Sequence, residues 1–385
     1  MSWDTVKLGE LYTVHNGLSK GSKFFGSGYP FLTFSTVFNN YFIPPELDSF
    51  VQSSEAERQN YSIKRGDVFL TRTSETSDEL GMSCVALKDY PNATYNGFTK
   101  RMRPFTDRIL PEFIGYYMRM PSFRGEFLAF STMTTRASLK NEDLLDLQIR
   151  LPEKETQKRI ADILSAYDNL IENNQKQIKL LEEAVQRLYK EWFVNFRFPG
   201  YEDTPIVDGV PEGWERLPVG ELIEKIPRTT QIMASEYGKE GPIPIIDQSR
   251  EFIAGYTDNH ASLVNVGKPV IVFGDHTRIL KYIQFPFAKG ADGTQLIVSN
   301  TDRMPQSLFY CSLVGVDLSN YHYARHFKYL KAEELLVPTQ VIAEAFDRFV
   351  SPMFSKIQRL RDINKAATNA RDRLLPKLMS GEIEV

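Results

Sequence analysis

The feature that most constrains this chain is a long apolar seam that occurs twice. Between Pro152 and Trp192, apolar residues recur at alternating steps of four and three, which is typical of a helix that packs against another helix. The ten positions of this seam are Ile160, Leu164, Tyr167, Ile171, Asn174, Ile178, Leu181, Val185, Leu188 and Trp192. Adding 186 to each number gives a second seam without a gap: Phe346, Val350, Met353, Ile357, Leu360, Asn364, Ala367, Arg371, Leu374 and Leu378. The sequence therefore predicts two long helices that are partners for each other.

The one amide in each seam predicts how the helices pair. In an antiparallel pair with full overlap, Asn174 lies opposite Asn364. In a parallel, in-register pair, each amide faces an apolar residue, Leu360 or Ile178, at a cost of roughly 1–3 kcal/mol apiece. We therefore expect an antiparallel pair in which Asn174 and Asn364 lie side by side and fix the register. Pro352 lies inside the second seam and predicts a kink or a restart of that helix.

The segment before each helix is duplicated as well. Trp3 is followed six residues later by Gly-Glu-Leu, and so is Trp214. The offset is 211 at this point and 186 along the helices, so the second folded unit is shorter by 25 residues (211 − 186). Gly and Pro separate short runs rich in β-branched and aromatic residues, which favours mixed α/β units with many short strands. The strands expected most clearly are 29–34, 68–73, 270–273 and 295–298, and a short helix is expected at 113–119.

These patterns predict five segments along the chain. The first α/β domain covers 1–151 and the first long helix 152–195. A linker rich in proline and glycine, without regular structure, covers 196–213. The second α/β domain covers 214–337 and the second long helix 338–380. A shared frame with a variable interior indicates one scaffold that carries two different recognition surfaces.

Composition excludes several classes of protein. Two cysteines, Cys84 and Cys311, cannot form a disulfide framework or a metal knuckle. The sequence shows neither a signal peptide nor an apolar run of membrane-spanning length, so a reducing cytoplasm is the simplest location. The net charge is −3, whereas a protein that binds nucleic acid alone is usually strongly basic. Any DNA-binding role therefore requires local basic patches or phosphate contacts shared with other subunits.

Several motifs within this layout carry a family resemblance. They are Leu151-Pro152, the run Glu155-Thr156-Gln157-Lys158-Arg159-Ile160, the aromatic run 192–200 and the segment Val210-Pro211-Glu212-Gly213-Trp214. Together with the duplicated layout, they make the chain similar over nearly its whole length to the specificity subunits of type I restriction–modification systems. The second helix departs from the pattern, because Pro338-Thr339-Gln340-Val341-Ile342 lacks the Glu-Gln-Arg signature. Unequal contacts by the two helices are therefore expected.

The resemblance implies a fold and a role. It implies two α/β target-recognition domains, each reading one half of a bipartite DNA target, and an antiparallel helix pair that sets the spacing between them. It also implies docking sites for two methyltransferase subunits and, in the full complex, for restriction subunits. S-adenosylmethionine, ATP and Mg would be bound by those partners, and this chain is expected to have no catalytic residue and no metal site of its own.

Candidate DNA contacts follow from the residue types that suit a groove. The run 321–331 has no acidic residue, interleaves basic with aromatic side chains, and occupies the same place in its repeat as 134–140. Arg pairs well with guanine, Gln with adenine and Asp with cytosine. In the first domain the candidates are Lys20, Lys23, Arg72, Thr73, Ser74, Lys100, Arg101, Arg103, Thr135 and Arg136. In the second they are Arg228, Gln231, Asp275, His276, Thr277, Arg278, Lys289, Gln295, His322, Tyr323, Arg325, His326 and Lys328.

Two other interpretations remain open at this point. The run Phe24-Phe25-Gly26-Ser27-Gly28 fits the glycine turn of adenine methyltransferases. However, no hydrophobic strand is expected before it, and Ile43-Pro44-Pro45-Glu46 lacks the amide and the aromatic of the companion motif. The run is therefore expected to be a plain loop. The chain could also be a coiled-coil scaffold that binds only protein, with its basic runs exposed to water.

Overall fold

The computed structural model describes residues 3–74, 79–129, 132–133, 137–138, 140–321 and 325–385. The chain forms two compact units. Unit 1 consists of Met1–Glu172 together with Asn364–Val385, and unit 2 of Asn173–Ile363. Each unit therefore contains one α/β domain and one end of each long helix, as the duplicated sequence predicts.

Two helices contain the predicted seams. Helix α6 covers Lys154–Tyr189 and ends in a π-helical turn at Lys190–Val194, and helix α9 covers Gln340–Ser380. All ten seam positions on each helix are buried or half-buried. Helix α9 continues through Pro352, so the predicted restart is wrong. Pro352 lies on the exposed side of α9, where water can satisfy the carbonyl that loses its donor.

The two helices are antiparallel within each unit, which confirms the predicted direction. In unit 1, Asp168 of α6 pairs with Arg371 of α9, and the Asn364 amide of α9 reaches the Ile171 carbonyl of α6 at 3.5 Å. In unit 2, Glu182 of α6 pairs with Arg361 of α9 at 2.9 Å. In the π-helical turn that follows α6, the ring of Trp192 packs against that of Phe346 in α9, with centroids 5.8 Å apart.

The polar residues of the seams are buried or half-buried. Asn174 is 3% exposed. Its predicted contact with Asn364 would cross from unit 2 to unit 1 and stays a prediction. Arg371, which interrupts the second seam, is held by the Asp168 carboxylate, and the other Asp168 oxygen accepts a hydrogen bond from the Tyr116 hydroxyl at 2.6 Å. A charge in the seam is therefore part of the attachment of the helices to the unit 1 domain.

The described residues of unit 1 form three small sheets and one strand pair. Its strands are β1 (Asp4–Lys7), β2 (Tyr12–Asn16), β3 (Phe25–Leu32), β4 (Phe50–Val51), β5 (Val68–Thr71), β6 (Thr73–Ser74), β7 (Ser83–Val85), β8 (Thr94–Tyr95), β9 (Thr99–Pro104), β10 (Thr132–Met133), β11 (Ala137–Ser138) and β12 (Gln148–Leu151). The sheet orders are β2-β9-β5-β7, β4-β3-β8 and β10-β11-β6, and β1 pairs with β12. Its short helices are α1 (Phe34–Asn39), α2 (Glu55–Asn60), α3 (Pro111–Tyr117), α4 (Pro121–Ala129) and α5 (Asn141–Asp146), with 3-10 turns η1 (Leu8–Glu10) and η2 (Ser22–Phe24).

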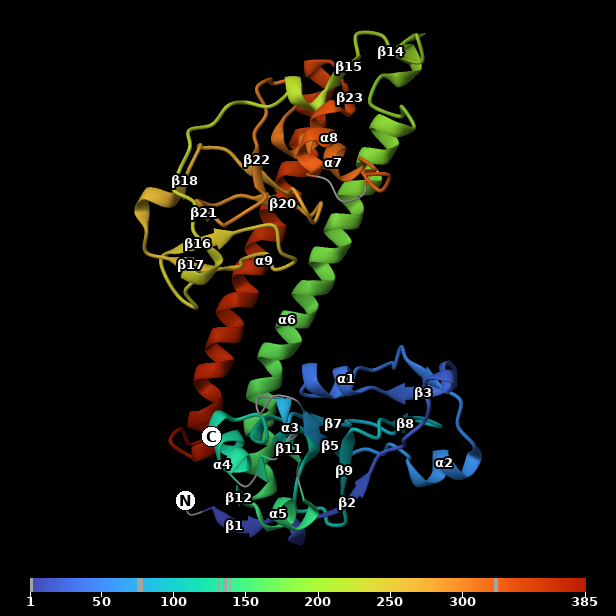
Figure 1. Cartoon of the computed structure of the whole chain (residues 1–385), viewed down its shortest axis with the longest axis vertical. Coiled ribbons are helices and arrows are strands. Elements are labelled where there is room, and N and C mark those ends of the chain that lie inside the picture. The colour runs from blue at the N-terminus through green and yellow to red at the C-terminus, as the bar shows by residue number, and fades with distance from the viewer. Residues whose placement is uncertain (1–2, 75–78, 130–131, 134–136, 139, 322–324) are drawn as a thin grey trace. The chain divides into compact units, whose positions relative to one another are not determined.

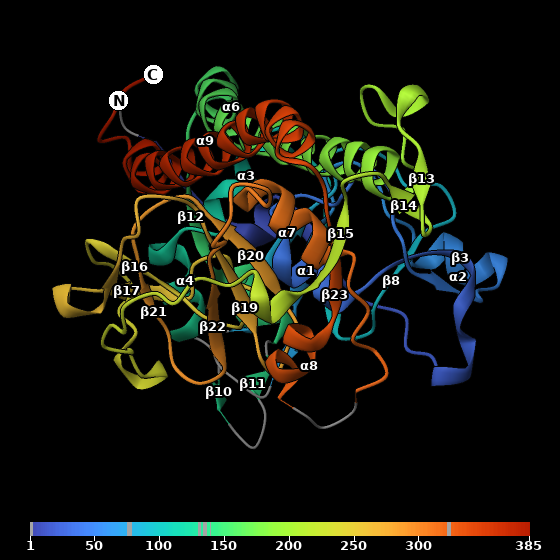
Figure 2. The same ribbon diagram turned by 90° about the horizontal axis from the view of Figure 1, so that it is seen from above.

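Unit 2 repeats this plan in fewer residues. Its strands are β13 (Ile206–Val207), β14 (Val210–Pro211), β15 (Glu215–Pro218), β16 (Ile243–Ile246), β17 (Gly255–Thr257), β18 (Leu263–Val264), β19 (Val270–Gly274), β20 (Leu280–Ile283), β21 (Phe287–Lys289), β22 (Thr294–Ile297) and β23 (Glu334–Val337). Strands β20, β19 and β22 form one sheet, seen side by side in Figure 2, and β17-β16-β21-β18 form another. Helices α7 (Gln306–Val314) and α8 (His326–Ala332) lie near the pair β15–β23 (Figure 1), and η6 (Val219–Glu221) follows β15.

The repeated Gly-Glu-Leu has a structural reason. In each unit the glycine lies in a 3-10 turn against the end of a short helix. A Cβ atom on Gly9 would meet the Leu145 carbonyl oxygen at 3.1 Å, and one on Gly220 would meet the Lys331 carbonyl oxygen at 3.2 Å. Leu145 and Lys331 are themselves 186 residues apart, so the same close approach is kept in both copies.

Most of the expected short elements are present. The expected strands correspond to β3, β5 with β6, β19 and β22, and the expected helix at 113–119 corresponds to α3. Two predictions are wrong. The linker contains the two-stranded hairpin β13–β14, because Asp208 and Gly209 both adopt positive φ and make a tight turn. Residues 25–28 of the glycine motif begin strand β3 and are not a plain loop, because β3 accommodates them through an irregular register against β4.

Candidate nucleic-acid interface

In each unit, two neighbouring strands of a sheet end side by side at equivalent positions. We call these paired strand ends the strand edge of the unit. In unit 1, Leu70 of β5 lies opposite Lys100 of β9, and the ladder continues until the Arg72 N–H donates to the Phe98 carbonyl at 3.0 Å. Many of the candidate contacts predicted for unit 1 lie at or beside this edge.

In unit 2 the equivalent ladder pairs β19 with β22. Phe273 lies opposite Gln295, and the Asp275 N–H donates to the Gly293 carbonyl at 2.7 Å. Gln295 therefore occupies the place of Lys100, and Asp275 the place of Arg72. Two pairs of candidate residues thus occupy equivalent positions in the two units, and the members of each pair differ in charge.

A threonine directly before the Lys100 or Gln295 position occurs in both units. Thr99 and Thr294 are buried, and each hydroxyl donates to the carbonyl three residues earlier, that of Asn96 at 2.6 Å and that of Ala291 at 3.3 Å. The scaffold under the edge is therefore constant, whereas the residues at the edge vary.

At the edge of unit 1, Arg72 and Lys100 form a like-charged pair. Burial first, and then the charge of Arg72, lower the pKa of Lys100. The Lys100 ammonium donates to the Asn141 side chain, and the buried Nε of Arg72 has no hydrogen-bond partner in the structure. Lys100 is 5% exposed, and among the described residues neither cation makes an ion pair with an acid.

In the other sheet of unit 2, Lys289 of β21 forms a second like-charged pair with Arg228. Lys289 is half-buried and Arg228 is exposed. Burial first, and then the charge of Arg228, lower the pKa of Lys289. Gln231, also a candidate, uses its side-chain amide to bind the Gly290 carbonyl at 3.0 Å. Within the described part of the chain, this pair too has no acidic partner.

Several candidates have interior roles that the sequence did not reveal. Arg101 is 7% exposed and donates to the Ser62 carbonyl at 2.8 Å. Arg103 forms a two-pronged ion pair with Asp67, which is fully buried. Alternate residues of β9 thus find acceptors within the domain, and the candidate role of Arg101 and Arg103 in DNA contact stays a prediction.

Asp275 and His326 also act inside the domain. The Asp275 carboxylate accepts the Phe327 N–H at 2.7 Å and so caps helix α8 from another element. Both ring nitrogens of the buried His326 lie within hydrogen-bonding distance of carbonyl oxygens, those of Asp275 at 2.8 Å and Tyr321 at 2.9 Å. His326 is therefore engaged within the domain, and its candidate role in DNA contact stays a prediction.

The remaining candidates divide into four groups. Lys23, His276, Thr277, Arg278, Arg325 and Lys328 are exposed. Lys20 is half-buried and forms an ion pair with Glu57 at 2.8 Å. Thr135, Arg136, His322 and Tyr323 lie outside the described residues, and Thr73 and Ser74 are described only as strand β6.

Three functional or supporting residues were not predicted individually. Gln248 contacts the tip of the β19–β20 hairpin through both its side chain and its carbonyl. Gln157 and Arg303 each tie a long helix to its domain. No sequence pattern of spacing or charge marks Gln248, whereas the repeat of Asp107-Arg108 as Asp302-Arg303 could have drawn attention to Arg303.

Gln157 and Arg303 perform the same task in different ways. The fully buried Gln157 amide donates to the carbonyls of Arg108 and Pro152, both at 2.8 Å, and accepts the Leu110 N–H. In unit 2, where Ala343 replaces the glutamine, the Arg303 guanidinium donates to the Pro338 carbonyl at 2.8 Å. The missing signature of the second helix therefore has a local replacement.

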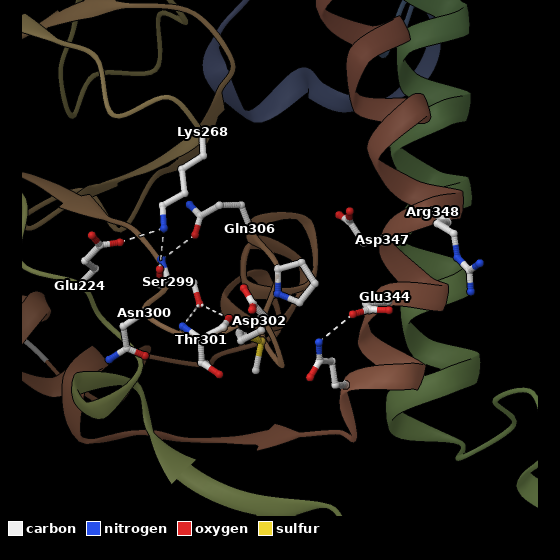
Figure 3. A pocket seen from close by; sticks show the side chains of 13 residues that line it. Glu224, Lys268, Ser299, Asn300, Thr301, Asp302, Gln306, Glu344, Asp347 and Arg348 are labelled. Atoms are coloured by element: carbon white, nitrogen blue, oxygen red, sulfur yellow. Dashed lines mark hydrogen bonds and ion pairs between the residues drawn. The ribbon is translucent and has the colours of Figure 1, made fainter.

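A separate hollow on unit 2 differs in charge from the strand edges. A cavity of about 780 Å³ lies between the segment after β22 and the start of α9 (Figure 3). Its acidic residues outnumber its basic ones, and Lys268 is engaged by Glu224 at 2.8 Å. Such a lining does not suit the phosphates of a nucleic acid.

Two other kinds of site are absent from the described residues. Within the described ranges, no three His, Cys, Asp or Glu side chains are grouped as metal ligands. None of the helices in the described part of the chain has both the length and the apolar character needed to cross a membrane.

The fold defines a class of protein: two copies of an α/β domain on one antiparallel helix pair. Residues 1–183 match the family described as type I restriction modification DNA specificity domain. The chain is 24% identical to the MjaIX specificity subunit of Methanocaldococcus jannaschii, over 100% of this chain and 94% of that protein. It is 23% identical to the HindI specificity subunit of Haemophilus influenzae, over 99% of each chain. Over nearly its whole length, the chain is therefore similar to the specificity subunits of type I restriction–modification systems.

A solved structure supports the fold. The S subunit of a type I restriction–modification system from M. genitalium superposes with a TM-score of 0.62 and covers 98% of this chain and 96% of its own. At 15% sequence identity, this likeness establishes the architecture and leaves the residues of each recognition surface to be argued from this chain.

Proposed function

We propose that this chain is the DNA-reading subunit of a type I restriction–modification complex, in which each α/β domain recognises one half of a bipartite target. The observation that carries the proposal is the matched end of two strand ladders: the positions of Arg72 and the buried Lys100 in unit 1 are occupied in unit 2 by the buried Asp275 and by Gln295. A constant support with different polar residues is what two readers of different sequences require.

The helices are proposed to set the distance between the two half-sites and to bind two methyltransferase subunits. Exposed apolar residues on the helices support a docking role, since Leu180 is 64% exposed, Val341 71% and Phe349 57%. Restriction subunits would join in the full complex. S-adenosylmethionine, ATP and Mg would be bound by these partners, and this chain would contribute no catalytic group.

The enzyme alternative has no support in the comparisons, which identify specificity subunits. The glycine motif also has the wrong context in the structure. A methyltransferase turn follows a strand, whereas Gly26 and Gly28 lie inside the start of β3.

DNA binding by the reconstituted complex tests the proposal. We expect the complex with its methyltransferase subunits to bind its target selectively and to lose affinity steeply as salt rises, because phosphate contacts release counterions. A fluorescence-anisotropy titration with target and scrambled duplexes at several salt concentrations measures both properties. Equal affinity for the two duplexes would contradict sequence reading and favour the protein-only scaffold.

Arg325→Ala tests whether the heads act separately. Arg325 is exposed at the start of α8 in unit 2, so its loss should lower methylation at one half-site by roughly tenfold, the size of one specific contact. Methylation rates on duplexes with changes in either half-site measure the effect. Equal loss of discrimination at both halves would contradict separate reading by the two domains.

A further inference from the structure

The tip of the β19–β20 hairpin in unit 2 is held in place by several hydrogen bonds and has one side chain that makes none to the described residues. The tip comprises Asp275, His276, Thr277 and Arg278, and all four residues are described by the structure. Backbone bonds close it at its base, from the Arg278 N–H to the Gly274 carbonyl at 2.7 Å and from the Gly274 N–H to the Ile279 carbonyl at 2.8 Å. Arg278 adopts a left-handed conformation, with φ of 62°, which a bulky residue keeps only when its surroundings hold it there.

Three of the four side chains at the tip are committed to the protein itself. The Asp275 carboxylate caps helix α8. The Thr277 hydroxyl donates to the Gln248 carbonyl at 2.7 Å, and the Arg278 guanidinium donates to the Leu318 carbonyl at 3.0 Å. The fourth side chain, His276, is exposed, and its ring makes no hydrogen bond to any described residue.

Gln248 fixes the tip from outside the hairpin. Its side-chain oxygen accepts a hydrogen bond from the backbone N–H of His276 at 3.1 Å, and its side-chain NH₂ group donates to the Asp292 carbonyl at 2.8 Å. One glutamine thus joins the hairpin tip to the segment that leads into β22.

Gly293 leaves room for the histidine ring because it has no side chain. With φ of 75°, it lies directly beneath the ring, and a Cβ atom there would meet His276 Cδ2 at 2.7 Å and the Gln248 amide nitrogen at 2.9 Å. The ring and the glutamine therefore occupy the space that any other residue at this position would fill.

We propose that His276 is a specificity-determining residue of unit 2 and that Gln248 is its positioning residue. An imidazole can donate a hydrogen bond to, or accept one from, the edge of a base in a duplex groove. Because hydrogen bonds already hold the hairpin tip in place, less conformational entropy is lost when that contact forms. This inference rests on the proposed function, because it names the side chain through which unit 2 reads its half-site.

Methylation by the reconstituted complex tests the inference. We expect His276→Ala to lower discrimination between the correct and a substituted base pair by roughly tenfold, at the half-site affected by Arg325→Ala. Gln248→Ala should lower it in the same half-site by a smaller factor, since the ring remains but is less well placed. Discrimination at the other half-site should not change.

Controls separate this role from folding and from non-specific binding. His260 is also an exposed histidine of unit 2, so His260→Ala should leave discrimination at both half-sites unchanged. Thermal unfolding of His276→Ala should match that of the wild type, since the ring has no bonds to lose. If His276→Ala leaves discrimination intact, or weakens binding to all sequences equally, the inference is overturned while the proposed function stands. If the wild-type complex shows no sequence preference, the proposed function and this inference both fail.

Discussion

Arg103→Met is expected to lower the free energy of unfolding of unit 1 by about 3–5 kcal/mol, because it leaves the fully buried Asp67 carboxylate without its counter-charge. Arg103 donates to Asp67 through two nitrogens, at 2.7 and 2.6 Å. The Asp67 carboxylate in turn raises the pKa of Arg103. Hydrogen exchange at the amides of β5 and β9 measures the effect in unit 1 alone.

Two further variants identify the cause of that loss. Asp67→Asn combined with Arg103→Met should recover part of the stability, because no charge is then left buried and the amide oxygen can still accept the Lys64 N–H. Arg159→Met removes an exposed ion pair within α6 and should cost less than about 1 kcal/mol. If Arg103→Met instead leaves hydrogen exchange unchanged and abolishes DNA discrimination, the interior role of Arg103 is refuted.

Gln157→Leu is expected to lower the stability of unit 1 by about 2–4 kcal/mol, because each buried polar group left without a partner costs about 1–3 kcal/mol. The variant removes three hydrogen bonds, to the carbonyls of Arg108 and Pro152 and from the Leu110 N–H. All three join the start of α6 to the domain. Hydrogen exchange at the first turns of α6 and at the amide of Leu110 measures the change.

The matched control for Gln157→Leu lies on the same helix. Gln175 is exposed on α6, so Gln175→Leu should change stability by no more than about 0.5 kcal/mol. Equal effects of the two substitutions would show that the helix is not anchored through Gln157. The control also separates loss of the anchor from any general effect of adding leucine to α6.

The sequence predicts the large features of the fold because they repeat with a fixed period. The seam with its 186-residue offset identifies both long helices, and the antiparallel direction follows from the placement of Asn174 and Asn364. The early Gly-Glu-Leu identifies the second copy of the domain. Helix propagation through Pro352 was not predictable from local preference, since it depends on which side of α9 faces water.

The candidate interface is less predictable because residue type does not reveal which way a side chain points. Arg101, Arg103 and His326 are residue types that suit a DNA groove. In the structure, however, each lies within hydrogen-bonding distance of oxygen atoms of its own domain. The importance of Gln248 arises from contacts with residues 28 and 44 positions away. Such contacts are long-range in sequence and carry no periodic signal.

The central claim, that each domain reads one half of a two-part target, is tested most directly by sequencing the methylome of cells that carry this chain with its methyltransferase subunits. For the wild type we predict one methylated motif in two parts, separated by a gap of fixed length. For His276→Ala we predict that one part becomes degenerate while the other part and the gap are kept. An uninterrupted motif in the wild type, or changes in both parts of the motif in His276→Ala, would contradict the account.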